Sequence, residues 1–67
     1  MFLVINGKDY SDLPAPLSVA GLLAHLSLPV KKIAVERNLE IVPKSTFKDT
    51  MLCDGDQLEI IHFIGGG

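Results

Sequence analysis

The sequence ends in a run of glycines, Gly65, Gly66 and Gly67, and these residues have the clearest potential for chemistry. Glycine has no side chain to pack and loses more conformational freedom on ordering than any other residue, so stability gives no reason for such a run. A glycine segment can, however, enter a narrow channel in another protein and present the α-carboxylate of Gly67 there. That carboxylate is ionised at neutral pH and can attack an activated phosphate as a nucleophile. The product would be an acyl-adenylate, from which a sulfur nucleophile can displace AMP.

A run of glycines at a chain end also has an ordinary explanation, because frayed termini and cloning remnants produce it. The context favours function here. The glycines directly follow a strongly patterned final strand, and the rest of the sequence offers no other visible site. We therefore predict that Gly67 is the reactive residue and that Gly65 and Gly66 form its flexible arm.

Three other side chains with chemical potential lack the companions that a site needs. Cys53 could carry a persulfide, but it has no neighbouring histidine or base, so we expect a small, partly buried apolar residue there. His25 and His62 have no metal-ligand companion at a usable spacing, which favours structural or surface roles and predicts no metal site.

Two charged segments are explained by local structure. The segment Asp54-Gly55-Asp56 predicts a tight turn; it lacks the later oxygen ligands and the terminal glutamate of a calcium-binding loop. Glu36, Arg37 and Glu40 indicate the solvated end of a hairpin, with contact to a partner as the alternative.

The elements that position the glycines follow from the apolar pattern. Asn6-Gly7 suits the positive φ angles of a type I′ turn, which predicts a hairpin. Ser18 offers an N-cap, and apolar residues recur after it at the spacing of one helical face. The expected strands and helix occupy residues 2–5 (strand), 8–13 (strand), 19–26 (helix), 33–35 (strand), 41–42 (strand) and 58–63 (strand).

These elements predict an α+β domain in which a mixed sheet packs against one helix, the ubiquitin-like β-grasp arrangement. A chain of 67 residues can bury one core only. We assign residues 1–63 to this domain and residues 64–67 to a flexible C-terminal tail. Residues 44–50 show no clear period, and we expect Phe47 and Met51-Leu52 to anchor that segment to the core.

The final strand predicts a docking surface, because side chains alternate between the two faces of a sheet. Leu58 and Ile60 would face the helix, whereas Ile61 and Phe63 would lie on the open face. An exposed apolar pair beside a flexible tail suggests a contact with a partner protein. In the alternative, the loop that carries Phe47 covers the pair.

Composition excludes several classes of protein. Eight acidic against six basic residues give a net charge of -2, which argues against nucleic acid as a partner. No apolar run approaches the roughly 20 residues of a membrane helix, and no secretion signal opens the sequence. A single cysteine excludes an internal disulfide, which fits the reducing cytoplasm.

Three stretches together resemble one known family, the thiamine-biosynthesis sulfur carrier proteins. The resemblance spans essentially the whole chain, although no stretch is specific alone. Family members often have an arginine where Lys44 stands, so a role for a planar guanidinium is in doubt at that position. The matching residues are Ala34-Val35-Glu36-Arg37-Asn38 with Ile41-Val42-Pro43-Lys44, then Asp54-Gly55-Asp56-Gln57-Leu58-Glu59-Ile60, then Gly66-Gly67.

The resemblance implies a cycle in which the chain is a protein substrate and not an enzyme. An adenylating enzyme related to ubiquitin-activating enzymes would join AMP to Gly67, using its own ATP and magnesium, so this chain would bind no cofactor. Sulfur from a donor such as a cysteine desulfurase would then replace AMP. The resulting Gly67 thiocarboxylate would deliver sulfur to thiazole synthase.

Three alternatives remain open at this point. The small subunit of molybdopterin synthase shares the fold and the terminal glycines, but it is usually longer and matches the stretches at 36–38 and 41–43 less well. A protein modifier would end with Gly67 in an isopeptide bond to a lysine. In a plain β-grasp interaction module, the glycines would be incidental.

Overall fold

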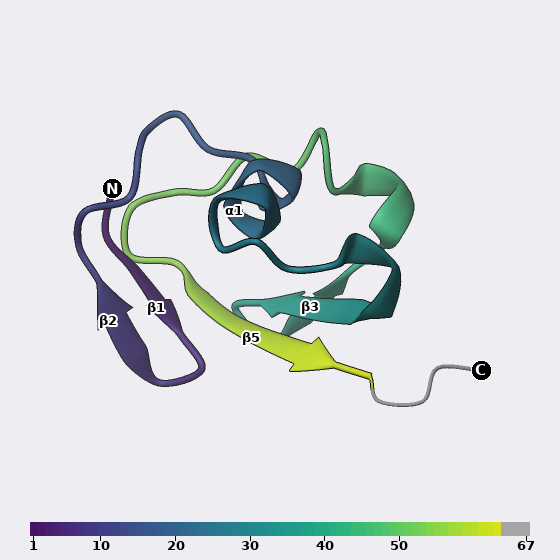
Figure 1. Cartoon of the computed structure of the whole chain (residues 1–67). Coiled ribbons are helices and arrows are strands. Elements are labelled where there is room, and N and C mark those ends of the chain that lie inside the picture. The colour runs from purple at the N-terminus through teal and green to yellow at the C-terminus, as the bar shows by residue number, and fades with distance from the viewer. Residues whose placement is uncertain (64–67) are drawn as a thin grey trace.

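The computed structural model describes residues 1–63, in which five strands form one mixed sheet and one helix packs on it (Figure 1). The predicted tail, with Gly65, Gly66 and Gly67, lies outside these described residues. The elements are β1 (Leu3–Ile5), β2 (Lys8–Tyr10), α1 (Val19–His25), a 3-10 turn (Val30–Lys32), β3 (Ile33–Arg37), β4 (Glu40–Val42), a second 3-10 turn (Lys44–Thr46) and β5 (Gln57–His62).

The last strand of the chain lies in the middle of the sheet. The strand order is β2-β1-β5-β3-β4, with β1 and β5 parallel and every other neighbouring pair antiparallel. The crossover between the parallel strands β1 and β5 contains α1, which covers one face of the sheet (Figure 1). The predicted α+β arrangement of a mixed sheet and one helix is therefore confirmed.

The first hairpin forms as predicted, but its second strand is shorter than expected. Asn6 and Gly7 have φ angles of 51° and 79°, which suit the tight turn. β2 ends at Tyr10 and not at Leu13, because Leu13 turns into the core. The carbonyl of Leu13 accepts a hydrogen bond from the amino group of Met1 at 2.7 Å.

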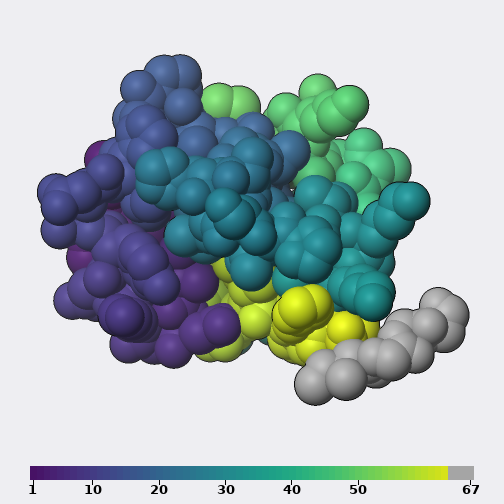
Figure 2. All heavy atoms as spheres, in the orientation of Figure 1, coloured from purple at the N-terminus to yellow at the C-terminus, as the bar shows by residue number. Residues whose placement is uncertain are grey.

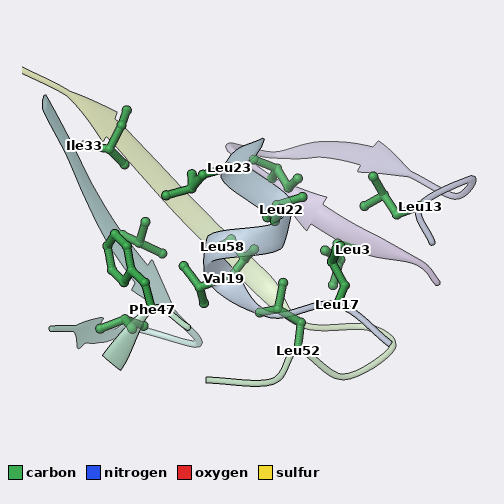
Figure 3. Packing of buried hydrophobic residues seen from close by; sticks show 13 residues of the cluster. Leu3, Leu13, Leu17, Val19, Leu22, Leu23, Ile33, Phe47, Leu52 and Leu58 are labelled. Atoms are coloured by element: carbon green, nitrogen blue, oxygen red, sulfur yellow. The ribbon is translucent and has the colours of Figure 1, made fainter. Parts of the chain in front are cut away.

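The helix begins where its cap predicts, and it builds the core. Ser18 Oγ accepts a hydrogen bond from the Gly21 N–H at 2.9 Å, and Val19, Leu22 and Leu23 are fully buried. Phe47 joins this cluster, as predicted (Figure 3). The expectation for Met51 is wrong, since its side chain is 48% exposed and only its neighbour Leu52 is buried.

The second hairpin has a tighter turn than the sequence suggested. The pattern predicts a strand over 33–35 only, with Glu36 and Arg37 at the solvated end of the hairpin, but both residues continue β3. The turn consists of Asn38 and Leu39, whose φ angles are 50° and 71°. Two consecutive positive φ angles match the right-handed twist of the flanking strands, which explains how β3 can extend so far.

Candidate functional site

The site predicted from the sequence follows β5, so the anchoring of this strand decides how the glycines are presented. Residues Leu58 to His62 pair with β3 along its whole length. The N–H of Phe63 then donates to the carbonyl of Lys32 at 2.7 Å. In Figure 2 the yellow atoms at the end of the described chain lie against teal atoms of the segment that leads into β3. Backbone hydrogen bonds therefore hold the chain as far as Phe63.

On its other side, β5 is held partly by the side chain of Asn6, which forms the hydrogen bonds that a neighbouring strand would form. β1 pairs with β5 only at Gln57 and Leu58. Beyond that point, Asn6 Nδ2 donates to the carbonyl of Ile60 at 3.1 Å, and the Ile60 N–H donates to Asn6 Oδ1 at 2.7 Å. Sequence reasoning assigned Asn6 to the turn and missed this second role. The residue type was the one available signal, because an asparagine side chain can donate a hydrogen bond and accept another, as a strand backbone does.

The beginning of β5 is tied to β3 through the nearly buried carboxylate of Asp56, whose side chain is 9% exposed. Its oxygens accept hydrogen bonds from Arg37 Nε at 2.8 Å, from the Cys53 N–H at 2.8 Å and from Asn38 Nδ2 at 3.1 Å. Burial by itself raises the pKa of Asp56, but these hydrogen bonds and the charge of Arg37 outweigh it and lower the pKa below its ordinary value. The hydrogen bond to Asp56 in turn raises the pKa of Arg37.

This cluster corrects the interpretation of Arg37 as a solvated residue. The Arg37 side chain is 28% exposed and forms an ion pair with Asp56. The turn at Asp54-Gly55-Asp56 is confirmed, with a φ of 87° at Gly55. The sequence did not reveal the pair because its two members are 19 residues apart.

The prediction for Cys53 is also wrong, because its side chain is exposed. Cys53 contributes its backbone N–H to Asp56, and Arg37 Nη2 approaches its sulfur at 3.5 Å. The turn therefore uses the backbone of this residue and leaves the side chain at the surface. The expectation of a partly buried apolar residue failed for this reason.

The remaining polar candidates are at the surface. His25 and His62 are exposed. Within residues 1–63 no group of three or more histidine, cysteine, aspartate or glutamate side chains could hold a metal ion. Lys44 Nζ donates to the carbonyl of Lys31 at 2.8 Å, so this lysine links the second 3-10 turn to the first. Among the described residues, no helix has the length and apolar character needed to cross a membrane.

Ile61 and Phe63 are both exposed, and the pairing of Ile61 with Ala34 places Ile61 on the open face of the sheet. Their exposed fractions are 49% and 48%, whereas Leu58 on the opposite face is 1% exposed. Phe47 cannot cover the pair, because it is buried in the core on the α1 side of the sheet (Figure 3). The alternative in which its loop shields them is therefore wrong. A docking role for Ile61 and Phe63 stays a prediction.

Comparison with known proteins places this geometry in a family. The model of the ThiS family matches residues 4–67. The sulfur carrier protein ThiS of Bacillus subtilis is 43% identical over 65 residues, which are 97% of this chain and 98% of that protein. The crystal structure of a thiamine biosynthesis protein (ThiS) from Geobacter metallireducens superposes with a TM-score of 0.85 at 36% identity, covering both chains completely.

Other relatives are much longer proteins. A thiazole synthase of Paramagnetospirillum magneticum is 52% identical over all 67 residues, and one of Magnetococcus marinus is 39% identical. This chain spans only 20% of the length of each. The family model, the full-length match to the short Bacillus subtilis carrier and the β-grasp structure agree with one another. The chain belongs to the ThiS family of sulfur carrier proteins of thiamine biosynthesis.

Proposed function

We propose that the chain carries sulfur for thiazole formation as a thiocarboxylate on the α-carboxyl group of Gly67. The observation that carries this proposal is the match to a short sulfur carrier over 98% of that protein's length, and the family model extends through Gly65-Gly66-Gly67. Both the family and these relatives favour thiamine biosynthesis over the molybdopterin pathway.

In the proposed chemistry, the Gly67 carboxylate attacks the α-phosphorus of ATP and pyrophosphate leaves. A sulfur nucleophile then attacks the carbonyl carbon of the acyl-adenylate and displaces AMP. ATP and magnesium are bound by a separate adenylating enzyme, and a cysteine desulfurase supplies the sulfur as a persulfide. The persulfide forms an acyl disulfide with Gly67 as AMP leaves, and a thiol then cleaves this acyl disulfide, which yields the thiocarboxylate and a disulfide. The role of this chain is that of a substrate, which its family supports.

The fold supports this role by holding the base of the glycine segment. β5 is bonded to β3 on one side and to β1 and Asn6 on the other, so Phe63 has a defined position on the sheet. We propose that Ile61 and Phe63 dock the adenylating enzyme while Gly65, Gly66 and Gly67 enter its active site. Thiazole synthase then receives the sulfur, and the relatives that bear its name support this partner. The cytoplasm remains the proposed location.

Intact-mass measurement tests the proposal. The mass of the protein isolated from its own cells first establishes whether Gly67 is the last residue. Incubation with the adenylating enzyme, ATP, magnesium and a sulfur donor should then replace one oxygen by sulfur. A variant with one alanine added after Gly67 is the matched control and should stay unmodified.

Two outcomes would contradict the proposal. The first is an unchanged mass under conditions that modify the carrier from Bacillus subtilis. The second is a higher-mass conjugate on a denaturing gel, which would instead indicate that Gly67 forms an isopeptide bond with a lysine.

A further inference from the structure

The open face of the sheet is the face away from α1. All charged strand residues on this face are acidic. Strand pairing and alternation place Asp9 of β2, Glu36 of β3 and Glu59 of β5 on this face. The two basic strand residues, Lys8 and Arg37, pair with the core residues Ile5 and Leu58 and so have the opposite orientation. The strands therefore present an acidic surface where a partner would meet the sheet.

Two of these carboxylates lie directly opposite each other. Glu36 of β3 pairs with Glu59 of β5, and both strands are interior strands of the sheet. Like charges in directly opposite positions destabilise a sheet. Within residues 1–63 the only ion pair is that between Arg37 and Asp56, so neither glutamate has a basic partner there. The fold thus retains an unfavourable pair at its centre.

Apolar side chains flank this pair on two sides. Ile41 of β4, which is 76% exposed, lies opposite Glu36 on the other side of β3. Ile61, which is 49% exposed, lies opposite Ala34 and two positions along from Glu59. A cation placed between the two carboxylates would therefore lie near two exposed apolar side chains, Ile41 beyond Glu36 and Ile61 along β5 from Glu59. An arginine or lysine, with its apolar stem and charged head, complements such a surface.

We propose that the open face binds the adenylating enzyme through a basic side chain of that enzyme, which sits between the carboxylates of Glu36 and Glu59. Apolar side chains of the enzyme pack against Ile41 and Ile61. This inference rests on the proposed function and specifies the chemistry of its docking surface. In the complex, both glutamates would be attracted to the bound cation. This attraction would offset their mutual repulsion, which destabilises the free carrier.

The lengths of the relatives favour the adenylating enzyme over thiazole synthase as the protein that binds this face. The matching segment is a separate short chain in Bacillus subtilis but a fifth of a longer chain in the two thiazole synthases. Where the carrier and the synthase are joined, their encounter is intramolecular and has a high effective concentration. The adenylating enzyme must be met by diffusion in both arrangements, and diffusional encounter is the step that charge complementarity accelerates.

The test compares two double variants with a matched control. Glu36→Gln with Glu59→Gln removes both charges and keeps the side-chain shape, and Glu36→Lys with Glu59→Lys reverses them. The control is Glu40→Gln, the same change at an exposed residue of β4 that pairs with Arg37 and so has the opposite orientation. Affinity for the adenylating enzyme of the same cell is measured by titration calorimetry at about 0.05 M and about 0.15 M salt.

We expect the glutamine pair to weaken binding about tenfold at the lower salt concentration and less at the higher one. The lysine pair should weaken binding about a hundredfold or more, and the control should stay within about twofold of the wild type. Thermal unfolding separates this effect from misfolding. Removing the repulsion should raise the Tm of the glutamine pair by about 1–5 °C while binding becomes weaker.

Equal affinities of the glutamine pair and the control would overturn the inference, as would a loss of affinity for thiazole synthase alone. Failure of the proposed function is a separate observation. In that case the wild-type chain forms no thiocarboxylate with saturating enzyme, ATP and sulfur donor, whatever the affinities of the variants.

Discussion

The two ends of β5 are built in different ways. At its beginning, the nearly buried Asp56 carboxylate joins Arg37, Asn38 and the backbone of Cys53, so side chains tie β5 to β3. At its end, backbone hydrogen bonds and the side chain of Asn6 hold the strand, and the large side chains Ile61 and Phe63 are half exposed. Side-chain hydrogen bonds to a carboxylate are thus found at the beginning of β5, and exposed apolar side chains lie at its end.

The largest expected effect comes from deleting Gly66 and Gly67. Thiocarboxylate formation should be lost completely, because the carboxylate would no longer reach the site of adenylation. The free energy of unfolding should change by less than about 0.5 kcal/mol, as for surface changes in general. Intact mass and thermal unfolding measure the two effects. Residual sulfur incorporation by the shortened chain would contradict the assignment of Gly67.

The next largest effect is on stability, at the opposite end of β5. Asp56→Ala should lower the free energy of unfolding by about 2–3 kcal/mol, because Arg37, Asn38 and the Cys53 N–H lose their common acceptor. Asp49→Ala, at an exposed aspartate, is the control and should change it by less than about 0.5 kcal/mol. Urea unfolding measures both. The folded fraction of the Asp56 variant should still accept sulfur. If the folded variant lost sulfur transfer, the beginning of β5 would have a functional role as well as a structural one.

Changes at the exposed end of β5 should affect binding and not folding. Ile61→Ser combined with Phe63→Ser should weaken binding to the adenylating enzyme by about 10–30-fold, as expected for apolar anchors of an interface. Leu39→Ser is the control, because Leu39 is 90% exposed but lies in the β3–β4 turn. Calorimetric titration gives the affinities. An unchanged affinity of the double variant would remove the docking role.

The smallest effect is a pH dependence that belongs to Asp56. Its pKa is lower in the folded chain, so between the folded and unfolded pKa values the unfolded state binds more protons. This contribution to stability is complete above the ordinary aspartate value of about 3.9 and is lost as the pH falls through the folded pKa. Urea unfolding of wild type and Asp56→Asn between about pH 6 and about pH 3 should show their difference shrinking with acid. A difference that stays constant with pH would show that Asp56 does not cause the pH dependence of stability.

Features that depend on residues close in the chain could be predicted from the sequence. The turn at Asn6-Gly7, the cap at Ser18 and the burial of Leu58 all appear in the structure. Contacts between distant residues could not. The Arg37–Asp56 pair spans 19 positions and the Asn6–Ile60 pair 54, and no periodicity links such residues.

The sequence by itself determined the order of the strands and the single helix along the chain, although not the bounds of β2 and β3. It also determined the alternation along β5 and the resemblance that rests on the motifs and the glycines. These depend on local backbone preferences and on the repeat of apolar side chains, which are properties of neighbouring residues. Only the tertiary structure decided that Glu36 lies opposite Glu59 and that Asp56 is nearly buried beside Arg37. Strand order and register bring these residues together, and they are set by the packing of the whole chain around one core.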